Sequence, residues 1–292
     1  MRGSLTDRRQ PRGGRPHGER ARPRRVALEV VMVLLGLLFI YPLVLVILNS
    51  FKSYGEIYNS PLSIPQTWRV ENYVFVWNDM QYLLKVLNSV FVTATPIPFV
   101  LFFGSMAAYK LARTKGVLST VLFYLFISTM LIPLNVIMVP LLILGRTLKM
   151  LDRLVSLVLV YIALSTPFAI FLYHGFIKNI KTDIEEAARI DGCGSFRTYL
   201  SIVFPMLRPI TTTILILLVL AYWNDFFLPL LIISKDPIKT LPLVAYKYHG
   251  QFMKEWSKIL PAVVLLSIPI FVFFFIFQRF ILEGIAQGAV KG

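Results

Sequence analysis

The chain has few of the residues that build metal centres or covalent cross-links. It contains one cysteine, Cys193, and three histidines, which stand far apart at positions 17, 174 and 249. A single cysteine excludes a disulfide within the chain, and scattered histidines lack the spacing of a metal-ligand set. We therefore expect no metal site and no cofactor held by this chain.

Charged residues are also scarce, and long apolar stretches take their place. Only 15% of the 292 residues are charged, 57% are hydrophobic, and the mean hydropathy is +0.70. So little polar material could not cover a soluble globular domain of this size. The apolar stretches are long and rarely broken by charge, unlike the short alternating strands of a membrane barrel. The sequence therefore predicts an all-α integral membrane protein.

Two features expected of enzymes are missing as well. The phosphate-binding pattern G-x-x-x-x-G-K-[ST] is absent, so we do not expect this chain to bind ATP itself. No clustered acidic pair and no histidine-containing constellation stands beside a predicted membrane surface. A membrane-embedded lipid or glycosyl transferase stays open as an alternative, but it has no candidate catalytic residues.

Basic residues dominate the charge that is present, and the net charge is +15. Nine arginines precede Val26 in a segment rich in glycine and proline. Such a segment cannot bury a core, so we predict that residues 1–25 form a disordered basic cytoplasmic tail. A polybasic segment directly before an apolar span is more typical of contact with anionic lipid, or of fixing orientation, than of RNA binding.

Residues 26–292 are predicted to form one six-helix transmembrane domain. Crossing a bilayer core takes about 20 apolar residues in a helix. Six stretches qualify, and they are 26–48, 83–108, 117–144, 154–177, 209–233 and 259–282. Each contains proline, which removes a backbone donor and kinks a helix, so we expect bent spans of the kind that transporters use. An even number of crossings and the arginine-rich tail together predict that both termini are cytoplasmic.

One long interruption separates the fourth and fifth predicted spans. It reads KNIKTDIEEAARIDGCGSFRTYLSIVFPMLRP, residues 178–209, and is called here the central segment. The capping-box spacing of Thr182 and Glu185 predicts a helix that begins just after residue 182, and Gly192 predicts its end. A second short helix is expected before Pro205. We therefore predict two short helices around a glycine turn at the cytoplasmic surface, with a shape suited to a groove in another protein.

The central segment also carries a family resemblance. EAARIDG, followed after nine residues by IVFP, resembles the EAA signature of permease subunits in bacterial ABC importers. Further matching patterns are ILNSFK, ENYVFVW, LNSVFVTA, AAYKLAR, WNDFFLPL and GAVKG, so the resemblance covers nearly all the chain from Val26 onward. Together they are similar to the carbohydrate-importer branch typified by the second permease of the maltose system. Phe204 and Cys193 depart from the signature, which usually has leucine and alanine at these places.

The resemblance implies a multi-pass subunit of the bacterial cytoplasmic membrane that does no covalent chemistry itself. It implies half of a translocation pathway for a sugar or sugar derivative, beside a second permease, two cytoplasmic ATPase subunits that bind ATP and Mg, and an extracytoplasmic solute-binding protein. In that family the EAA loop lies in a cleft of the ATPase. The implied ATPase-coupling residues are Glu185, Glu186, Ala187, Ala188, Asp191, Gly192, Gly194 and Pro205.

Asp225 is the one ionised residue well inside a predicted span, which makes it a candidate for the solute pathway. It also stands close to the outer interface, so a helix-positioning role is open as well. Tyr222, Trp223 and Asn224 offer the ring face and hydrogen bonds that a sugar needs, and Asn135 is a further candidate. An ion-coupled transporter acting alone is a second alternative, although it would need ionisable residues at mid-membrane.

Overall fold

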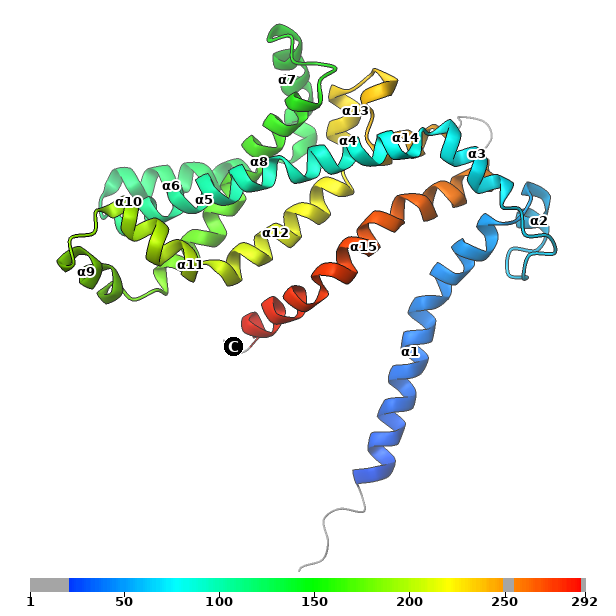
Figure 1. Cartoon of the computed structure of the whole chain (residues 1–292), viewed down its shortest axis with the longest axis horizontal. Coiled ribbons are helices and arrows are strands. Elements are labelled where there is room, and N and C mark those ends of the chain that lie inside the picture. The colour runs from blue at the N-terminus through cyan, green and yellow to red at the C-terminus, as the bar shows by residue number, and fades with distance from the viewer. Residues whose placement is uncertain (1–20, 249–254, 290–292) are drawn as a thin grey trace, which may run out of the picture.

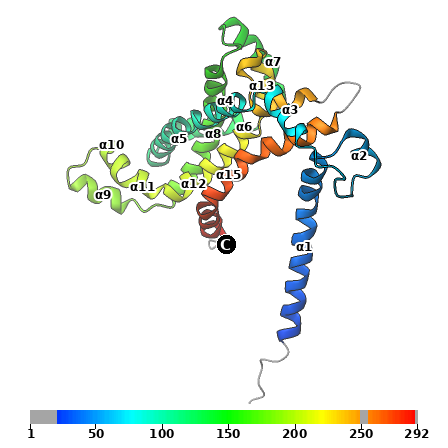
Figure 2. The same cartoon turned by 45° about the vertical axis from the view of Figure 1, so that its right-hand side comes forward.

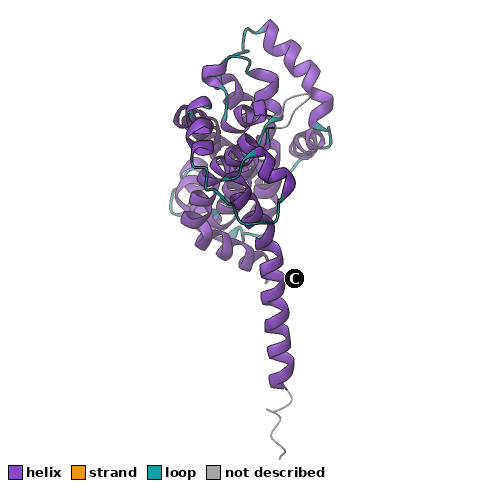
Figure 3. Cartoon of the chain, turned by 90° about the vertical axis from the view of Figure 1, so that its right-hand side faces the viewer, coloured by secondary structure: helices purple, strands orange, loops and turns teal. Residues whose placement is uncertain are grey.

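A computed structural model of the chain describes residues 21–248 and 255–289, with side chains over 26–248 and 255–279. Every regular element in these ranges is a helix (Figure 3). In chain order they are α1 (Ala21–Ser50), α2 (Tyr54–Asn59), α3 (Glu71–Asp79), α4 (Tyr82–Ala94), α5 (Pro96–Arg113), α6 (Val117–Met130), α7 (Leu134–Thr147), α8 (Leu154–Lys178), α9 (Asp183–Ile190), α10 (Ser195–Thr198), η1 (Tyr199–Val203), α11 (Phe204–Met206), α12 (Arg208–Trp223), α13 (Phe227–Ile232), η2 (Asp236–Ile238), α14 (Leu241–Ala245), η3 (Tyr246–Tyr248) and α15 (Trp256–Ala289).

Four helical stretches of the described chain are long and apolar enough to cross a membrane: Val26–Ser50, Tyr82–Arg113, Leu154–Lys178 and Trp256–Arg279. The second runs through α4 and α5, where proline stands in the first turn of α5 and interrupts few backbone hydrogen bonds. Two further pairs, α6 with α7 and α10–α11 with α12, reach that length only if each bent pair is one crossing. The all-α membrane class is therefore confirmed, with four to six crossings.

The predicted third span is wrong as a single helix. α6 ends at Met130, α7 begins at Leu134, and the two are bent by 97°. Pro133 explains the break, because it has no backbone N–H to donate and its backbone is extended, with ψ of 139°. Pro140 is accommodated inside α7.

The predicted fifth span also divides. α12 ends at Trp223 and α13 begins at Phe227, so Asp225 lies in the break between two helices and not inside a span. At the start of α12, Leu207 separates it from α11, and the two helical runs are bent by 72°. The predicted crossing 209–233 therefore forms two helical pieces, α12 and α13, with a short break between them.

The helices form an elongated bundle with two distinct ends (Figure 1). At one end, called the α9 end, α9 to α11 lie beside the last turns of α5. At the other, called the α2 end, lie α2, α3 and α14. Between them α5 packs along α8 so closely that a Cβ added to Gly104 would come within 3.0 Å of the Ala169 Cβ. Glycine at this position therefore allows a close contact between these two helices.

Most of α1 stands away from the bundle (Figures 1 and 2). A window of 18 consecutive residues in its apolar stretch has a mean hydropathy of 3.0, yet none of that window is buried within the chain. Among the side chains described for α1, only Asn49 and Ser50 in its last turn are buried. α1 begins at Ala21, so the predicted tail boundary at residue 25 falls inside this helix, and residues 1–20 lie outside the described part.

Buried polar side chains at the end of α1 and directly after it fix the loop that follows. The Asn49 amide donates to the carbonyls of Leu45 and Pro61, each at 2.8 Å. The fully buried Lys52 ammonium donates to the Ser60 carbonyl at 2.9 Å. These residues belong to the ILNSFK motif, so the motif holds the last turn of α1 against the loop that follows it.

The LNSVFVTA motif does the same for the loop after α13. The Asn88 amide donates to the carbonyls of Pro237 and Lys239 at 2.9 and 3.0 Å, and the Ser89 hydroxyl accepts the Leu241 N–H at 2.8 Å. The neighbouring Lys85, fully buried, donates to the backbone carbonyl of Asp236. Both Asn-Ser pairs therefore hold loops at the α2 end.

A third loop contact is made by Asp152, between α7 and α8. Its carboxylate accepts the Ser234 backbone N–H at 2.6 Å, the Ser234 hydroxyl at 2.8 Å and the Lys235 N–H at 3.1 Å. These hydrogen bonds lower the pKa of Asp152, because they stabilise its ionised form. The carboxylate thus fastens the chain after α13 to the α7–α8 turn.

Candidate functional site

The central segment folds into two short helical runs joined by a tight turn at the α9 end. α9 covers Asp183–Ile190, and α10, η1 and α11 follow from Ser195 to Met206. Gly192 has φ of +82°, a conformation that costs little only for glycine. Gly194 is extended, with φ of −68° and ψ of 158°, so it does not share this requirement. The predicted helix, turn and second helix are confirmed, and Gly192 alone makes the left-handed turn.

The predicted capping box is wrong, because Glu185 has a different task. The Thr182 side chain makes no capping hydrogen bond, and Glu185 is turned into the protein with 2% of its surface exposed. Its carboxylate accepts the Tyr109 hydroxyl at 2.8 Å and the Arg113 Nε–H at 2.8 Å. Arg113 also donates to the Ile180 carbonyl at 2.9 Å. We call Tyr109, Arg113 and Glu185 the Glu185 contact.

The coupling residues named from the sequence therefore lie on two faces of the segment. Glu185 and Ala188 point into the protein. The exposed residues of the set are Glu186, Ala187, Asp191, Gly192, Gly194 and Pro205. Ile190 and Phe196 beside them expose 86% and 60% of their surfaces. The outward face thus combines small residues, two carboxylates and large apolar side chains.

Pro205 and its neighbours connect this face to the membrane helices. Pro205 lies in the first turn of α11, and the bend towards α12 comes after it, at Leu207. Tyr199 of η1 is buried, and its hydroxyl lies 2.8 Å from the Ser105 hydroxyl of α5. Its ring also meets the Phe102 and Phe204 rings, at centroid distances of 6.4 and 5.9 Å. η1 is therefore attached to the same helix as α9.

The pathway candidates near residue 225 do not form one site. Asp225 accepts the Phe227 N–H at 2.9 Å, so its carboxylate caps α13, and it also accepts the Tyr161 hydroxyl at 2.8 Å. Tyr222 stacks on Tyr161 at 4.3 Å between centroids. The Asn224 side chain is exposed and donates to the Leu220 carbonyl. Helix positioning thus accounts for the described contacts of Asp225.

Tyr222, Asn224 and Asp225 line a cavity of about 270 Å³ between α8, α12 and the start of α7. Asn135 is a neighbour of Leu134, which lines the same cavity, but its own side chain is exposed. This cavity lies on the α8 side of α12. Trp223 does not line this cavity, because consecutive residues of a helix point in directions about 100° apart.

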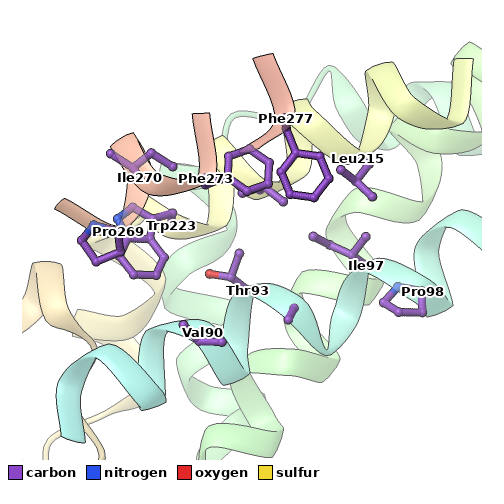
Figure 4. Close-up of a pocket in the computed structure, with 12 residues that line it drawn as sticks. Val90, Thr93, Ile97, Pro98, Leu215, Trp223, Pro269, Ile270, Phe273 and Phe277 are labelled. Carbon is purple, nitrogen blue, oxygen red and sulfur yellow. The ribbon is translucent and has the colours of Figure 1, made fainter. Parts of the chain in front are cut away.

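Trp223 lines a second cavity, of about 370 Å³, between α4, α5, α12 and α15 (Figure 4). Its walls are the aromatic rings of Trp223, Phe273 and Phe277 together with aliphatic side chains. Two polar groups interrupt them: the Thr93 hydroxyl and the Trp223 indole N–H are buried and have no hydrogen-bond partner in the described residues. Buried polar groups are normally paired, so these two unpaired groups are unusual features of an otherwise apolar wall.

Three residues of these sites were not singled out from the sequence. Tyr109 and Arg113 entered only as letters of the AAYKLAR pattern, and Thr93 as part of LNSVFVTA. A signal for the first two exists, because Ser105, Tyr109 and Arg113 are spaced four residues apart and share one helix face at the end of an apolar span. Thr93 has no comparable signal, because its partnerless hydroxyl is a tertiary feature.

Comparisons with known proteins agree with this architecture. The family described as "Binding-protein-dependent transport system inner membrane component" matches residues 100–287. The "Probable starch degradation products transport system permease protein AmyC" of Thermoanaerobacterium thermosulfurigenes is 34% identical, over 92% of this chain and 97% of that protein. The "Diacetylchitobiose uptake system permease protein NgcG" of Streptomyces coelicolor is 31% identical, over 90% and 88%.

The "Multiple sugar-binding transport system permease protein MsmG" of Streptococcus mutans is 34% identical, over 90% of this chain and 95% of that protein. Among solved structures, a bacterial ABC transporter involved in the import of the acidic polysaccharide alginate contains a chain of similar fold. It superposes with a TM-score of 0.76 at 19% identity, covering 91% of this chain and 99% of that one. At this identity the likeness supports the fold alone.

Proposed function

The chain belongs to the inner membrane components of binding-protein-dependent transport systems, and from this premise we propose that it forms half of a sugar translocation pathway. As a member of this family it is a multi-pass permease of the bacterial inner membrane, and it is not itself an enzyme. Energy for import comes from an ATPase, and solute arrives on a binding protein. In our proposal two ATPase subunits hold the ATP and Mg, and a second permease completes the pathway.

The observation that carries this proposal is the outward face of the central segment. Glu186, Ala187 and Asp191 are exposed beside Ile190 and Phe196 at one end of the bundle. Small residues allow a close approach, exposed apolar side chains favour a groove, and a carboxylate fixes orientation more than it adds affinity. We assign this face to the ATPase, which puts the α9 end and both termini in the cytoplasm.

The solute class follows from the relatives and is supported by the cavity at Trp223. AmyC, NgcG and MsmG are named for starch degradation products, diacetylchitobiose and multiple sugars. Sugars pair with flat aromatic faces and with isolated hydrogen-bonding groups, and this cavity offers both through its three rings, Thr93 and Trp223. We propose that the wall around Thr93 and Trp223 contacts the passing solute.

A second permease is supported by α1. An apolar helix that packs against its own bundle only near one end is covered elsewhere by lipid or by another protein, and the splay of α1 suits a neighbouring subunit. Six crossings, formed when each bent pair counts once, are part of the same proposal. The transferase and the lone ion-coupled transporter are not proposed, because no observation favours them.

The test is retention of the ATPase by a charge-reversed permease. We expect Glu186→Lys to reduce the amount of ATPase that co-purifies with the tagged chain several-fold, because the substitution puts a cation into the docking face. Glu71→Lys is the matched control: it reverses an exposed charge in the first turn of α3, at the α2 end, and should leave co-purification unchanged. Equal ATPase recovery from the two variants would remove Glu186 from the interface.

A further inference from the structure

We propose that the Glu185 contact is the joint through which movement of α9 reaches the solute cavity, so that Tyr109, Arg113 and Glu185 act as positioning residues in coupling. This inference rests on the proposed function. It assigns a task to residues that face away from the ATPase, and it separates coupling from docking. The long helix formed by α4 and α5 carries the movement.

The contact attaches α9 to α5 at two atoms of one carboxylate. Tyr109 donates to Oε2 and Arg113 to Oε1 of Glu185, each at 2.8 Å. The side chains of Arg113 and Glu185 are 15% and 3% exposed, so water competes little for either partner. A buried pair in this geometry resists separation, because loss of one member leaves an uncompensated buried charge. Displacement of α9 should therefore displace the end of α5.

Little else holds α9 in place. Its only buried residues are Glu185 and Ala188, and Ala188 offers a single methyl group. Arg113 also donates to the Ile180 carbonyl in the turn that leads from α8 into α9. The same guanidinium thus connects α5, α9 and the chain between them, which makes Arg113 the central member of the contact.

A second attachment follows on the same face of α5. The Ser105 hydroxyl lies 2.8 Å from the Tyr199 hydroxyl of η1, and Tyr199 in turn contacts Phe102. Ser105, Tyr109 and Arg113 follow one another at intervals of four residues, so they form one stripe along the helix. Both helical runs of the central segment therefore act on one face of one helix.

That helix leads directly to the cavity. α4 and α5 form one apolar stretch from Tyr82 to Arg113, and Thr93 and Ile97 on it line the space opposite Trp223. From Arg113 to Ile97 the helix rises about 24 Å at 1.5 Å per residue. The close contact of Gly104 with Ala169 holds α5 to α8 between these points. Movement of the Arg113 end is thus transmitted to the cavity wall with α8 following.

The experiment separates assembly, ATP turnover and uptake in the complete reconstituted transporter. Glu185→Gln keeps the shape of the side chain and removes its charge, and Tyr109→Phe removes a single hydroxyl. Arg113→Ala is compared with Lys110→Ala, which removes an exposed cation from the same last turns of α5. We expect all four variants to retain the ATPase at the wild-type amount.

Solute uptake per ATP hydrolysed should fall in the first three variants by about five- to a hundredfold, the usual size of coupling between two sites, and stay unchanged in Lys110→Ala. A wild-type ratio of uptake to ATP in Glu185→Gln and Arg113→Ala would overturn the proposal. So would a loss of uptake that merely follows loss of the ATPase. If the wild-type chain itself retains no ATPase, the proposed function fails instead.

A rescue experiment tests whether the Glu185 contact transmits movement or only stabilises the fold. In a Cys193→Ala background, Arg113→Cys and Glu185→Cys are combined and linked by a short bifunctional thiol reagent. We expect the unlinked pair to be uncoupled and the linked pair to regain uptake per ATP, because a covalent link replaces the ionic one. A linked transporter that stays uncoupled would contradict the inference.

Discussion

Glu185 and Glu186 are adjacent in the chain, but the helix separates their side chains by about 100° and gives them opposite environments. Glu185 is buried against Tyr109 and Arg113, whereas Glu186 is exposed. Tyr222 and Trp223 divide in the same way, one facing Tyr161 and the other the cavity of Figure 4. From the sequence alone, both residues of each pair are expected to have the same role. The directions of their side chains in the structure show that the roles differ.

The two partnerless polar groups of the cavity lead to a prediction at this scale. Thr93→Val replaces the hydroxyl by a methyl group of similar size, and Trp223→Phe keeps an aromatic ring but removes the N–H. Because one hydrogen bond contributes about 0.5 to 1.5 kcal/mol, each change should lower uptake about two- to tenfold at low solute concentration. The measurement is the concentration dependence of uptake by the reconstituted transporter.

Thr212→Val serves as the control, because that hydroxyl donates to the Arg208 carbonyl of its own helix and lines neither cavity. Unchanged kinetics in both Thr93→Val and Trp223→Phe would mean that the solute does not touch this wall. ATPase retention should be equal in all three variants.

At the scale of elements, apolar length predicts the helices but not the breaks between them. α6 and α7 separate at Pro133 inside an apolar stretch, and α12 and α13 separate where the polar residues Asn224 and Asp225 interrupt one. Counting apolar residues measures length only and cannot detect a bend. Proline is equally ambiguous, since Pro140 lies inside α7 while Pro133 ends the run before it. That Asp225 caps α13 can be seen only in the folded structure.

The turn between α9 and α10 gives the prediction at this scale. Gly192→Val forces a branched residue into φ of +82° and should strain the turn by about 1 to 2 kcal/mol, while the chain still inserts in the membrane. We expect ATP hydrolysis to persist and uptake to fall. Gly194→Val is the control, because that position is extended and equally open, with nothing within 4 Å of an added Cβ.

The measurement is uptake per ATP hydrolysed by the two valine variants, compared with the wild type. Only Gly192→Val should depart from the wild-type ratio. Similar effects of the two substitutions would show that side-chain size at the turn, and not backbone conformation, decides coupling.

At the scale of the whole molecule, two opposite ends are joined by one long helix. The α2 end is tied by buried Lys52, Lys85 and the two Asn-Ser pairs, and the α9 end is attached through α5. Figure 1 places the two ends at opposite extremes of the bundle, with α4 and α5 running between them. A movement at one end can therefore be transmitted along the whole bundle, as alternating access requires.

This arrangement predicts which end faces the cytoplasm. Cys193 is the only cysteine, it lies in the turn after α9, and it is partly exposed. A membrane-impermeant maleimide should leave it unlabelled in intact spheroplasts and label it after permeabilisation. Glu71→Cys in a Cys193→Ala background should behave in the opposite way, because residue 71 is exposed at the α2 end. Labelling of Cys193 from outside would reverse the proposed orientation.

The sequence by itself determined the membrane class, the approximate positions of the long helices and the helix-turn-helix of the central segment. These follow from local properties: apolar length, glycine at a left-handed turn, and a linear signature. Tertiary structure decided which glutamate is buried, where two predicted spans break, that α1 stands apart, and which polar groups lack partners. Those outcomes depend on contacts between distant residues, such as Arg113 with Glu185, 72 positions apart, and Lys85 with Asp236, 151 positions apart. No local pattern encodes which distant residue completes such a contact.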